Sequence, residues 1–221
     1  MITSIKKHLA EVPYNINLAA PVILGMLGHT LVAFADNIMV GRLGPAELAA
    51  VSLGNSFLFI AMSVGLGLST AITPLIAEAD GFKKQFEIKK VFKHGVLICA
   101  VVGLVLTGVV FLSVPLLYQM QQPEEVLVFA VPFLTIVGVS LIPLMLFQAI
   151  KQLCDGLSRT RLPMYASIIG NLLNVLLNYL LIFGNFGFPE MGVAGAALGT
   201  LISRLVMLLL LIAFLKGSPF F

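Results

Sequence analysis

Long apolar stretches separated by short polar ones make up almost the whole chain. Six of these stretches reach the ~20 residues that a helix needs to cross the hydrocarbon of a bilayer, and they lie at about 14–40, 48–77, 92–118, 128–150, 163–184 and 193–216. None of them alternates in the ~10-residue segments that mark a membrane β-barrel. The pattern therefore predicts an all-α integral membrane protein, in which a bundle of six transmembrane helices forms a single lobe over residues 1–221.

Composition points to the same class of protein. Hydrophobic residues make up 59% of the chain and charged residues 10%, with a mean hydropathy of +1.07, whereas charged residues are about a quarter of a soluble domain. The net charge of +3 resides in short basic clusters between the apolar stretches, where membrane orientation explains it. The lipid bilayer is thus an expected partner, and nucleic acid is not.

The basic residues also predict how the spans are oriented. With the N-terminus in the cytoplasm, eleven of the thirteen Lys and Arg residues fall on the cytoplasmic side, as the positive-inside rule requires. Of the other two, Arg42 lies in an outer loop and Arg204 within the last span. We therefore expect both termini to be cytoplasmic. The longest inner loop, 80–93, sets three phenylalanines against five lysines and is expected to be a short amphipathic helix at the membrane surface, solvated rather than a specific lipid site.

The first span carries a carboxylate at membrane depth. Asp36 has apolar neighbours on both sides. An ionised carboxylate inside the bilayer costs several kcal/mol unless it faces protein, water or a cation. His29 lies seven residues earlier, on the same helical face, where a satisfied core residue and a cavity-lining one both remain open. A charge kept at this depth indicates a function.

A polar face runs along the fifth span. Asn171, Asn174 and Asn178 are spaced i, i+3 and i+7, which puts their side chains on one side of a helix. An unpaired buried amide costs on the order of 1–3 kcal/mol, so these amides either bond neighbouring helices or line a cavity, and three in register favour the cavity. In the sixth span Thr200 and Arg204 are i and i+4, and Arg204 either extends to the membrane surface or pairs with a carboxylate.

Four of these residues are candidates for one ion site. If Asp36, Asn174, Asn178 and Thr200 converge, they supply one titratable oxygen ligand and three neutral ones, which suit Na⁺ or a proton. Either ion would couple an ion gradient to a conformational change. No resident cofactor is expected beside this H⁺ or Na⁺.

Several stretches of the chain resemble the MATE (multidrug and toxic compound extrusion) family of cation-coupled antiporters, close to its bacterial NorM-type members. The resembling elements are Ala20-Pro21 followed fifteen residues later by Asp36, VGRLGPAELAAVSLGNS at 40–56, TPLIAEADG at 73–81, CDGLSRTRLPMYASIIGNLLNVLLNYLLIFG at 154–184, and GVAGAALGT at 192–200. Together they cover essentially the whole chain.

The resemblance implies a lobe of six helices around a central cavity and the export of amphipathic, often cationic, drug-like compounds driven by inward flow of H⁺ or Na⁺. It implies that Asp36 is the coupling acid, with Asn174, Asn178 and Thr200 beside it. Some members carry a second acid where this chain has Asn178, which leaves the coupling ion open. Pro21 is the counterpart of the proline at which the first helix is proposed to bend.

Family transporters resemble two such lobes, about twelve spans in all. We therefore expect a second six-helix lobe, in the same full-length chain or in a homodimer, and a location in the bacterial inner membrane. Two other functions stay open: a lipid or polysaccharide-precursor flippase of the same superfamily, and a non-transporting subunit whose polar residues only hold helices together. An enzyme is not expected, because the chain lacks HExxH and GxSxG motifs and an aspartyl protease needs two buried aspartates.

Overall fold

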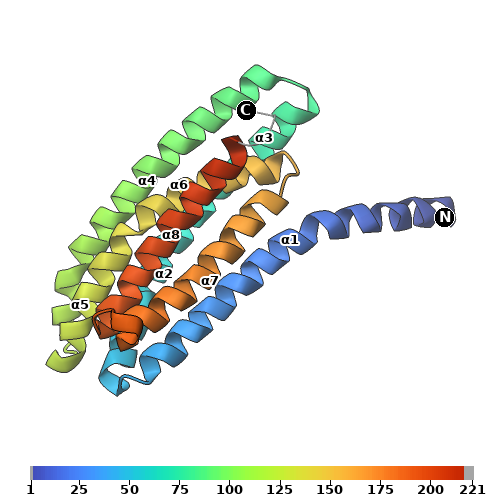
Figure 1. The fold of residues 1–221 in the computed structure, drawn as a ribbon. Coiled ribbons are helices and arrows are strands. Elements are labelled where there is room, and N and C mark those ends of the chain that lie inside the picture. Colours follow the sequence, from blue (N-terminus) through green and yellow to red (C-terminus); the bar gives the residue numbers. More distant parts are fainter. Residues whose placement is uncertain (1, 217–221) are drawn as a thin grey trace.

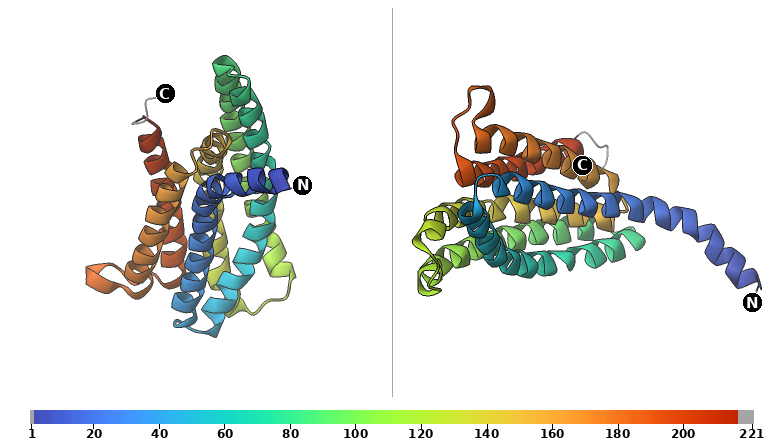
Figure 2. Two further views of the ribbon diagram at one scale, coloured as in Figure 1. Left: turned by 90° about the vertical axis from the view of Figure 1, so that its right-hand side faces the viewer. Right: turned by 90° about the horizontal axis from the view of Figure 1, so that it is seen from below.

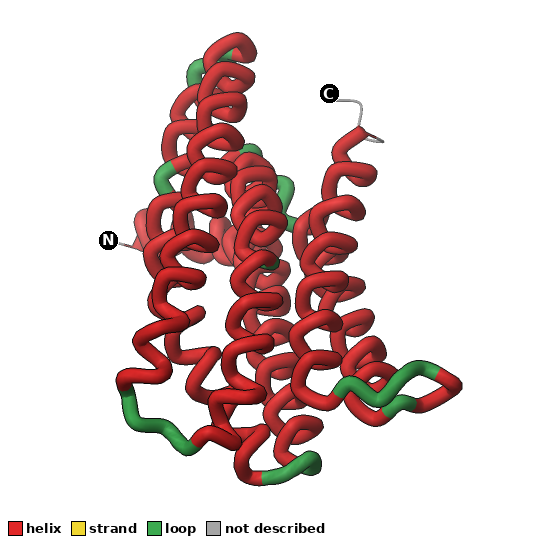
Figure 3. The backbone as a smooth tube through the Cα atoms, turned by 90° about the vertical axis from the view of Figure 1, so that its left-hand side faces the viewer, coloured by secondary structure: helices red, strands yellow, loops and turns green. Residues whose placement is uncertain are grey.

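All regular structure in the described part of the chain is helical. The structure is a computed structural model that describes the backbone of residues 2–216 and the side chains of residues 16, 19–25, 27, 28 and 30–216. The helices run back and forth between two ends, where short loops connect them (Figure 3). They are α1 (Ile2–Gly41), α2 (Pro45–Thr70), α3 (Ile72–Gly81), α4 (Gln85–Gln119), α5 (Glu124–Val139), α6 (Leu141–Gly156), α7 (Arg161–Phe183), the short η1 (Asn185–Gly187) and α8 (Gly192–Lys216).

Six helical segments are long and apolar enough to cross a membrane, which confirms the prediction of a six-helix transmembrane bundle. Two of these segments are each built from two helices, α2 with α3 and α5 with α6. The segments are Ala19–Gly41, Pro45–Gly81, Gln85–Gln119, Glu124–Gly156, Arg161–Phe183 and Gly192–Lys216.

Both breaks within a span lie one turn before a proline. α2 ends at Thr70, four residues before Pro74, and α5 ends at Val139, four residues before Pro143. A proline gives no N–H to the carbonyl four residues earlier, and its ring clashes with that carbonyl, so the helix bends there. The second bend leaves Ser140 fully buried between α5 and α6, inside the bundle.

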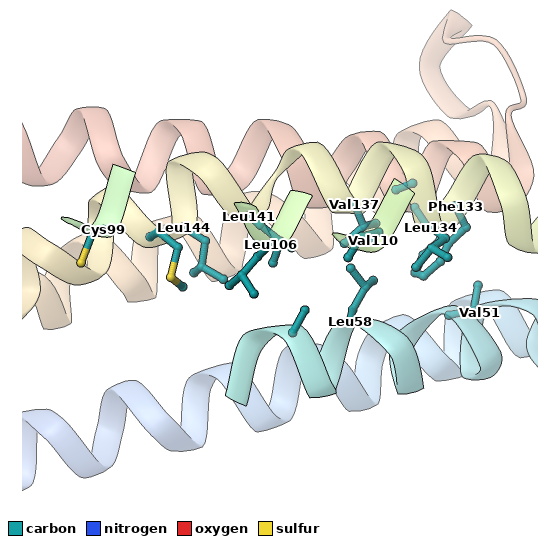
Figure 4. Close-up of a cluster of buried hydrophobic side chains, with 14 of the residues drawn as sticks. Val51, Leu58, Cys99, Leu106, Val110, Phe133, Leu134, Val137, Leu141 and Leu144 are labelled. Carbon is teal, nitrogen blue, oxygen red and sulfur yellow. The ribbon is translucent and has the colours of Figure 1, made fainter. Parts of the chain in front are cut away.

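The bundle is held together by an apolar core between α2, α4, α5 and α6. Val51 and Leu58 of α2 face Val110 of α4 and Phe133 and Val137 of α5 (Figure 4). On the opposite side α7 packs along α8, and α1 packs along α7 and α2 (Figures 1 and 2). Every spanning segment also exposes large apolar side chains, which is the surface expected of a protein that faces lipid.

Small residues bring α7 and α8 close together. A Cβ added at Gly195 would lie 2.6 Å from the carbonyl oxygen of Leu181, and one added at Gly170 would overlap the side chain of Met207. Helices in lipid associate through such close approaches. The contact sets the polar face of α7 against the hydroxyl groups of α8.

The residues of 80–93 do not form a separate surface helix, which corrects the expectation from the sequence. α3 ends at Gly81, Lys83 takes a left-handed conformation with φ 54°, and α4 then runs unbroken from Gln85 to Gln119. The chain turns only over 82–84, and no proline or glycine before Gly95 interrupts the helix after it. The basic and aromatic residues of 85–93 are therefore the first turns of a transmembrane helix.

Candidate functional site

Asp36 is tied to the fifth span. On α1 its Oδ1 accepts a hydrogen bond of 2.6 Å from Nδ2 of Asn178 on α7. Asn178 is fully buried. Hydrogen bonds to an ionised carboxylate are stronger than those between neutral groups, so this contact stabilises the charge that the sequence places at membrane depth.

The amides continue the contact from α7 into α8. Nδ2 of Asn178 also donates to Oδ1 of Asn174 at 3.3 Å, and Nδ2 of Asn174 donates to Oγ of Ser203 at 3.3 Å and to Oγ1 of Thr200 at 3.5 Å. The two hydroxyls donate in turn to backbone carbonyls of their own helix. The four residues proposed from the sequence thus lie in one hydrogen-bonded chain, and Ser203 joins them.

The oxygen atoms of these hydrogen-bonded residues fit a small hard cation or a proton. Asp36 contributes carboxylate oxygens, and Oδ1 of Asn178 is buried with no hydrogen-bond partner in the described part of the structure. Thr200 and Asn174 add neutral oxygens. Carboxylate, amide and hydroxyl oxygens are hard ligands, which suit Na⁺ better than a soft transition metal.

Asp36 also faces a cavity of about 290 Å³ inside the bundle. The cavity is lined by α1, α2, α5, α6, α7 and α8. Its lining is mainly apolar and includes several polar side chains. The polar lining residues are Asp36, Asn55, Asn171, Asn174, Thr200, Ser203 and Arg204.

A second cavity of about 590 Å³ adjoins the first. Met62, Leu144, Asn171 and Met207 line both of them. The larger cavity extends to the end of α6, where Lys151 and Asp155, both among its lining residues, form an ion pair of 2.6 Å. In the orientation expected from the basic residues, this end of the lobe would face the cytoplasm.

Arg204 lies inside the bundle and does not extend to the membrane surface. Its Nη1 donates to Oγ of Ser140 at 2.6 Å, and its Nη2 contacts Sδ of Met62 at 3.7 Å. Sequence reasoning left its partner open between solvent and a carboxylate, and it missed Ser140. The available signal was Pro143, which marks the break between α5 and α6 where Ser140 is buried.

The remaining candidates occupy different positions. Asn171 lines both cavities, and its Nδ2 is buried with no hydrogen-bond partner in the described structure. Pro21 is buried and lines the larger cavity, within a continuous α1. His29 lies on α1, but its side chain is outside the described residues.

The sequence matches one protein family and several of its known members. The MatE family model matches residues 21–180. The multidrug resistance protein NorM of Vibrio cholerae is 32% identical over 212 residues, which cover 96% of this chain and 46% of that protein. A probable multidrug resistance protein NorM of Bacillus licheniformis is 32% identical over 208 residues, which cover 93% of this chain and 46% of that protein.

Solved structures show the same fold. A crystal structure of MATE in the bent conformation superposes with a TM-score of 0.84 at 25% identity, over 93% of this chain and 46% of the other. A crystal structure of MATE in the straight conformation gives 0.83 at 26% identity, over 93% and 45% of the two chains. The chain spans about half the length of the relatives and structures that it matches.

Proposed function

The chain belongs to the MATE family of multidrug efflux transporters, and from this membership we propose that it forms one lobe of an antiporter that exports amphipathic, often cationic, compounds against an inward flow of H⁺ or Na⁺. The family is one of transporters, not enzymes. The observation that carries the proposal is the bond from Asn178 to Asp36 at the edge of a cavity. This bond joins Asp36, the one carboxylate among the residues that line the cavity, to α7.

In this proposal Asp36 is the coupling group. A proton or Na⁺ that binds there neutralises the carboxylate, so the hydrogen bond from Asn178 loses its charge-assisted part. The contact between α1 and α7 weakens, and a cationic cargo loses its counter-charge. α1 then bends near Pro21, where the missing backbone N–H already weakens the helix. Asn174 and Thr200 supply oxygens that hold the ion.

We propose that the larger cavity binds the apolar part of the exported compound. Its volume of about 590 Å³ lies in the range of pockets that hold drug-sized ligands. Met62, Met164 and Met207 line it, and methionine side chains adapt to ligands of different shape. A flippase is not favoured, because the cations that line the two cavities are Arg204 and the ion-paired Lys151.

The transport cycle needs a second lobe. One lobe alternates access by rocking against another around a central site, and the relatives that this chain matches are about twice its length. We propose that the lobe lies in the bacterial inner membrane, because its relatives are bacterial. The start of α1 and the end of α8 would then face the cytoplasm.

The intact gene product in proteoliposomes tests the proposal. We expect efflux of a cationic dye under an imposed pH gradient or an imposed Na⁺ gradient, and the gradient that drives it identifies the ion. Asp36→Asn is expected to abolish driven efflux without lowering the amount of protein in the membrane. Asp80→Asn, which changes an exposed acid at the end of α3, is the control and is expected to transport normally. Gradient-driven efflux that persists in Asp36→Asn would show that Asp36 is not the coupling group.

A further inference from the structure

Arg204 faces the cavity with one side of its guanidinium poorly matched. Nη1 has a strong partner in Ser140 at 2.6 Å, but Nη2 has Sδ of Met62 at 3.7 Å. A thioether sulfur is only a weak acceptor. A guanidinium presents five N–H donors in a planar fork whose spacing matches a carboxylate. An anionic oxygen in the cavity would therefore replace the sulfur as the partner of Nη2.

A donor with no hydrogen-bond partner in the described structure, Nδ2 of Asn171, lies at the boundary between the two cavities. Asn171 and Met62, the residue that Nη2 contacts, line both the smaller and the larger cavity. Nδ2 of Asn171 is buried with no partner in the described structure, and native proteins rarely leave such a donor unmatched. Nη2 of Arg204, which contacts a residue that lines both cavities, and Nδ2 of Asn171 thus both lack a strong acceptor.

Ser140 fixes how the guanidinium is presented. It is fully buried at the bend between α5 and α6, and its own hydroxyl donates to the carbonyl of Val137 at 2.6 Å. The hydroxyl oxygen is thereby held in place to accept from Nη1. Ser140 is a positioning residue, and it leaves the Nη2 edge for a ligand.

We infer that Arg204 and Asn171 form a docking subsite for a carboxylate of the exported compound. This rests on the proposed function and narrows its cargo to amphipathic compounds that carry a carboxylate, with the apolar body in the larger cavity. Asp36 and Arg204 are the two charged residues in the lining of the smaller cavity. One of them serves the coupling ion or a cationic group of the cargo, and the other serves the cargo's carboxylate.

A rhodamine dye with a free carboxylate and the methyl ester of the same dye test the inference. The two share one cationic ring system and differ only at the carboxylate. Fluorescence anisotropy with the purified intact protein gives their affinities without any need for transport. We expect the acid to bind at least about tenfold more tightly than the ester, because the docking bond is charge-assisted.

Variants assign that preference to residues. Arg204→Gln is expected to remove most of the preference for the acid, and Asn171→Leu to reduce it severalfold. Arg161→Gln removes an exposed cation at the start of α7, outside both cavities, and is expected to keep the full preference. If Arg204→Gln gives no folded peak in size-exclusion chromatography, Arg204→Lys decides, because lysine keeps the charge but loses the fork and should lower the preference severalfold.

Binding affinity tests the docking subsite, and gradient-driven efflux tests the antiport function. Equal affinity for acid and ester in the unmodified protein, or an acid preference that survives Arg204→Gln and Arg204→Lys, overturns the docking subsite even if gradients drive efflux of both dyes. Conversely, an acid preference that depends on Arg204 supports the subsite, while the absence of driven efflux for either dye overturns the antiport function alone.

Discussion

A single methyl group on α8 is predicted to disconnect Asp36 from its partner on α7. Gly199 faces Asn178, and a Cβ at this position would overlap Oδ1 of that side chain. Asn178 is 0% exposed, and its Nδ2 is held by Asp36 at 2.6 Å and by Asn174 at 3.3 Å. In Gly199→Ala the amide therefore has to rotate or the helices have to separate. Either change breaks the bond to Asp36.

The size of the effect follows from three contributions. Overpacking a filled interior costs about 1–3 kcal/mol. The lost hydrogen bond costs about 1.5–3 kcal/mol by the values for charged groups in water, but only ~0.6 kcal/mol by the average for bonds between helices in a membrane. Alanine returns about 0.5–1 kcal/mol over glycine in a helix. The net destabilisation expected for Gly199→Ala is roughly 0.6–5.5 kcal/mol.

Two assays measure this loss beside a matched control. Gly67→Ala adds the same methyl group to a helix, α2, where the new Cβ meets no other part of the structure within 4 Å apart from the adjacent backbone of its own helix, so only the helix propensity changes. We expect Gly199→Ala to lower the midpoint of thermal aggregation in detergent by several degrees and to impair gradient-driven efflux strongly, whereas Gly67→Ala does neither. If the two variants behave alike in both assays, the packing argument for Asn178 is refuted.

Three further changes test the contacts around the site. Gly170→Ala forces a Cβ onto the side chain of Met207 and should destabilise the fold by about 1–3 kcal/mol, and the added change Met207→Ala should restore much of the loss in a thermal double-mutant cycle. Thr73→Val removes the 2.5 Å bond to Oε1 of Gln152 that ties α3 to α6, and should cost about 1 kcal/mol in the same thermal assay. Lys151→Met leaves the carboxylate of Asp155 without its ion-pair partner, and it should lower the stability more than Thr73→Val does. An unchanged aggregation midpoint in Thr73→Val or in Lys151→Met contradicts these estimates.

The sequence was sufficient to predict the six spans and the polar face of the fifth. Both depend on local periodicity, since an apolar run of about 20 residues has few alternatives to a membrane helix. The spacing of Asn171, Asn174 and Asn178 fixes one helical face whatever the neighbours are. The structure also brings Asp36, Asn174, Asn178 and Thr200 together, although their role in ion coupling stays a prediction.

What the sequence did not reveal depends on how segments far apart in the chain pack. The partner of Arg204 is Ser140, 64 residues away, which is buried at the break between α5 and α6. Prolines alone are an incomplete guide, because α4 and α5 continue through Pro115 and Pro132. The junction of the two cavities likewise has no local signature, because its lining comes from several helices.

The coupling role of Asp36 is tested most directly by measuring ion movement rather than cargo. Proteoliposomes that hold the intact gene product and a trapped pH- or Na⁺-sensitive dye are given a gradient of the cargo alone, with no ion gradient imposed. We expect the cargo gradient to drive H⁺ or Na⁺ in the opposite direction. Asp36→Asn should remove this ion movement, and Asp80→Asn should keep it. Cargo-driven ion movement of undiminished size in Asp36→Asn would show that Asp36 is not the coupling group.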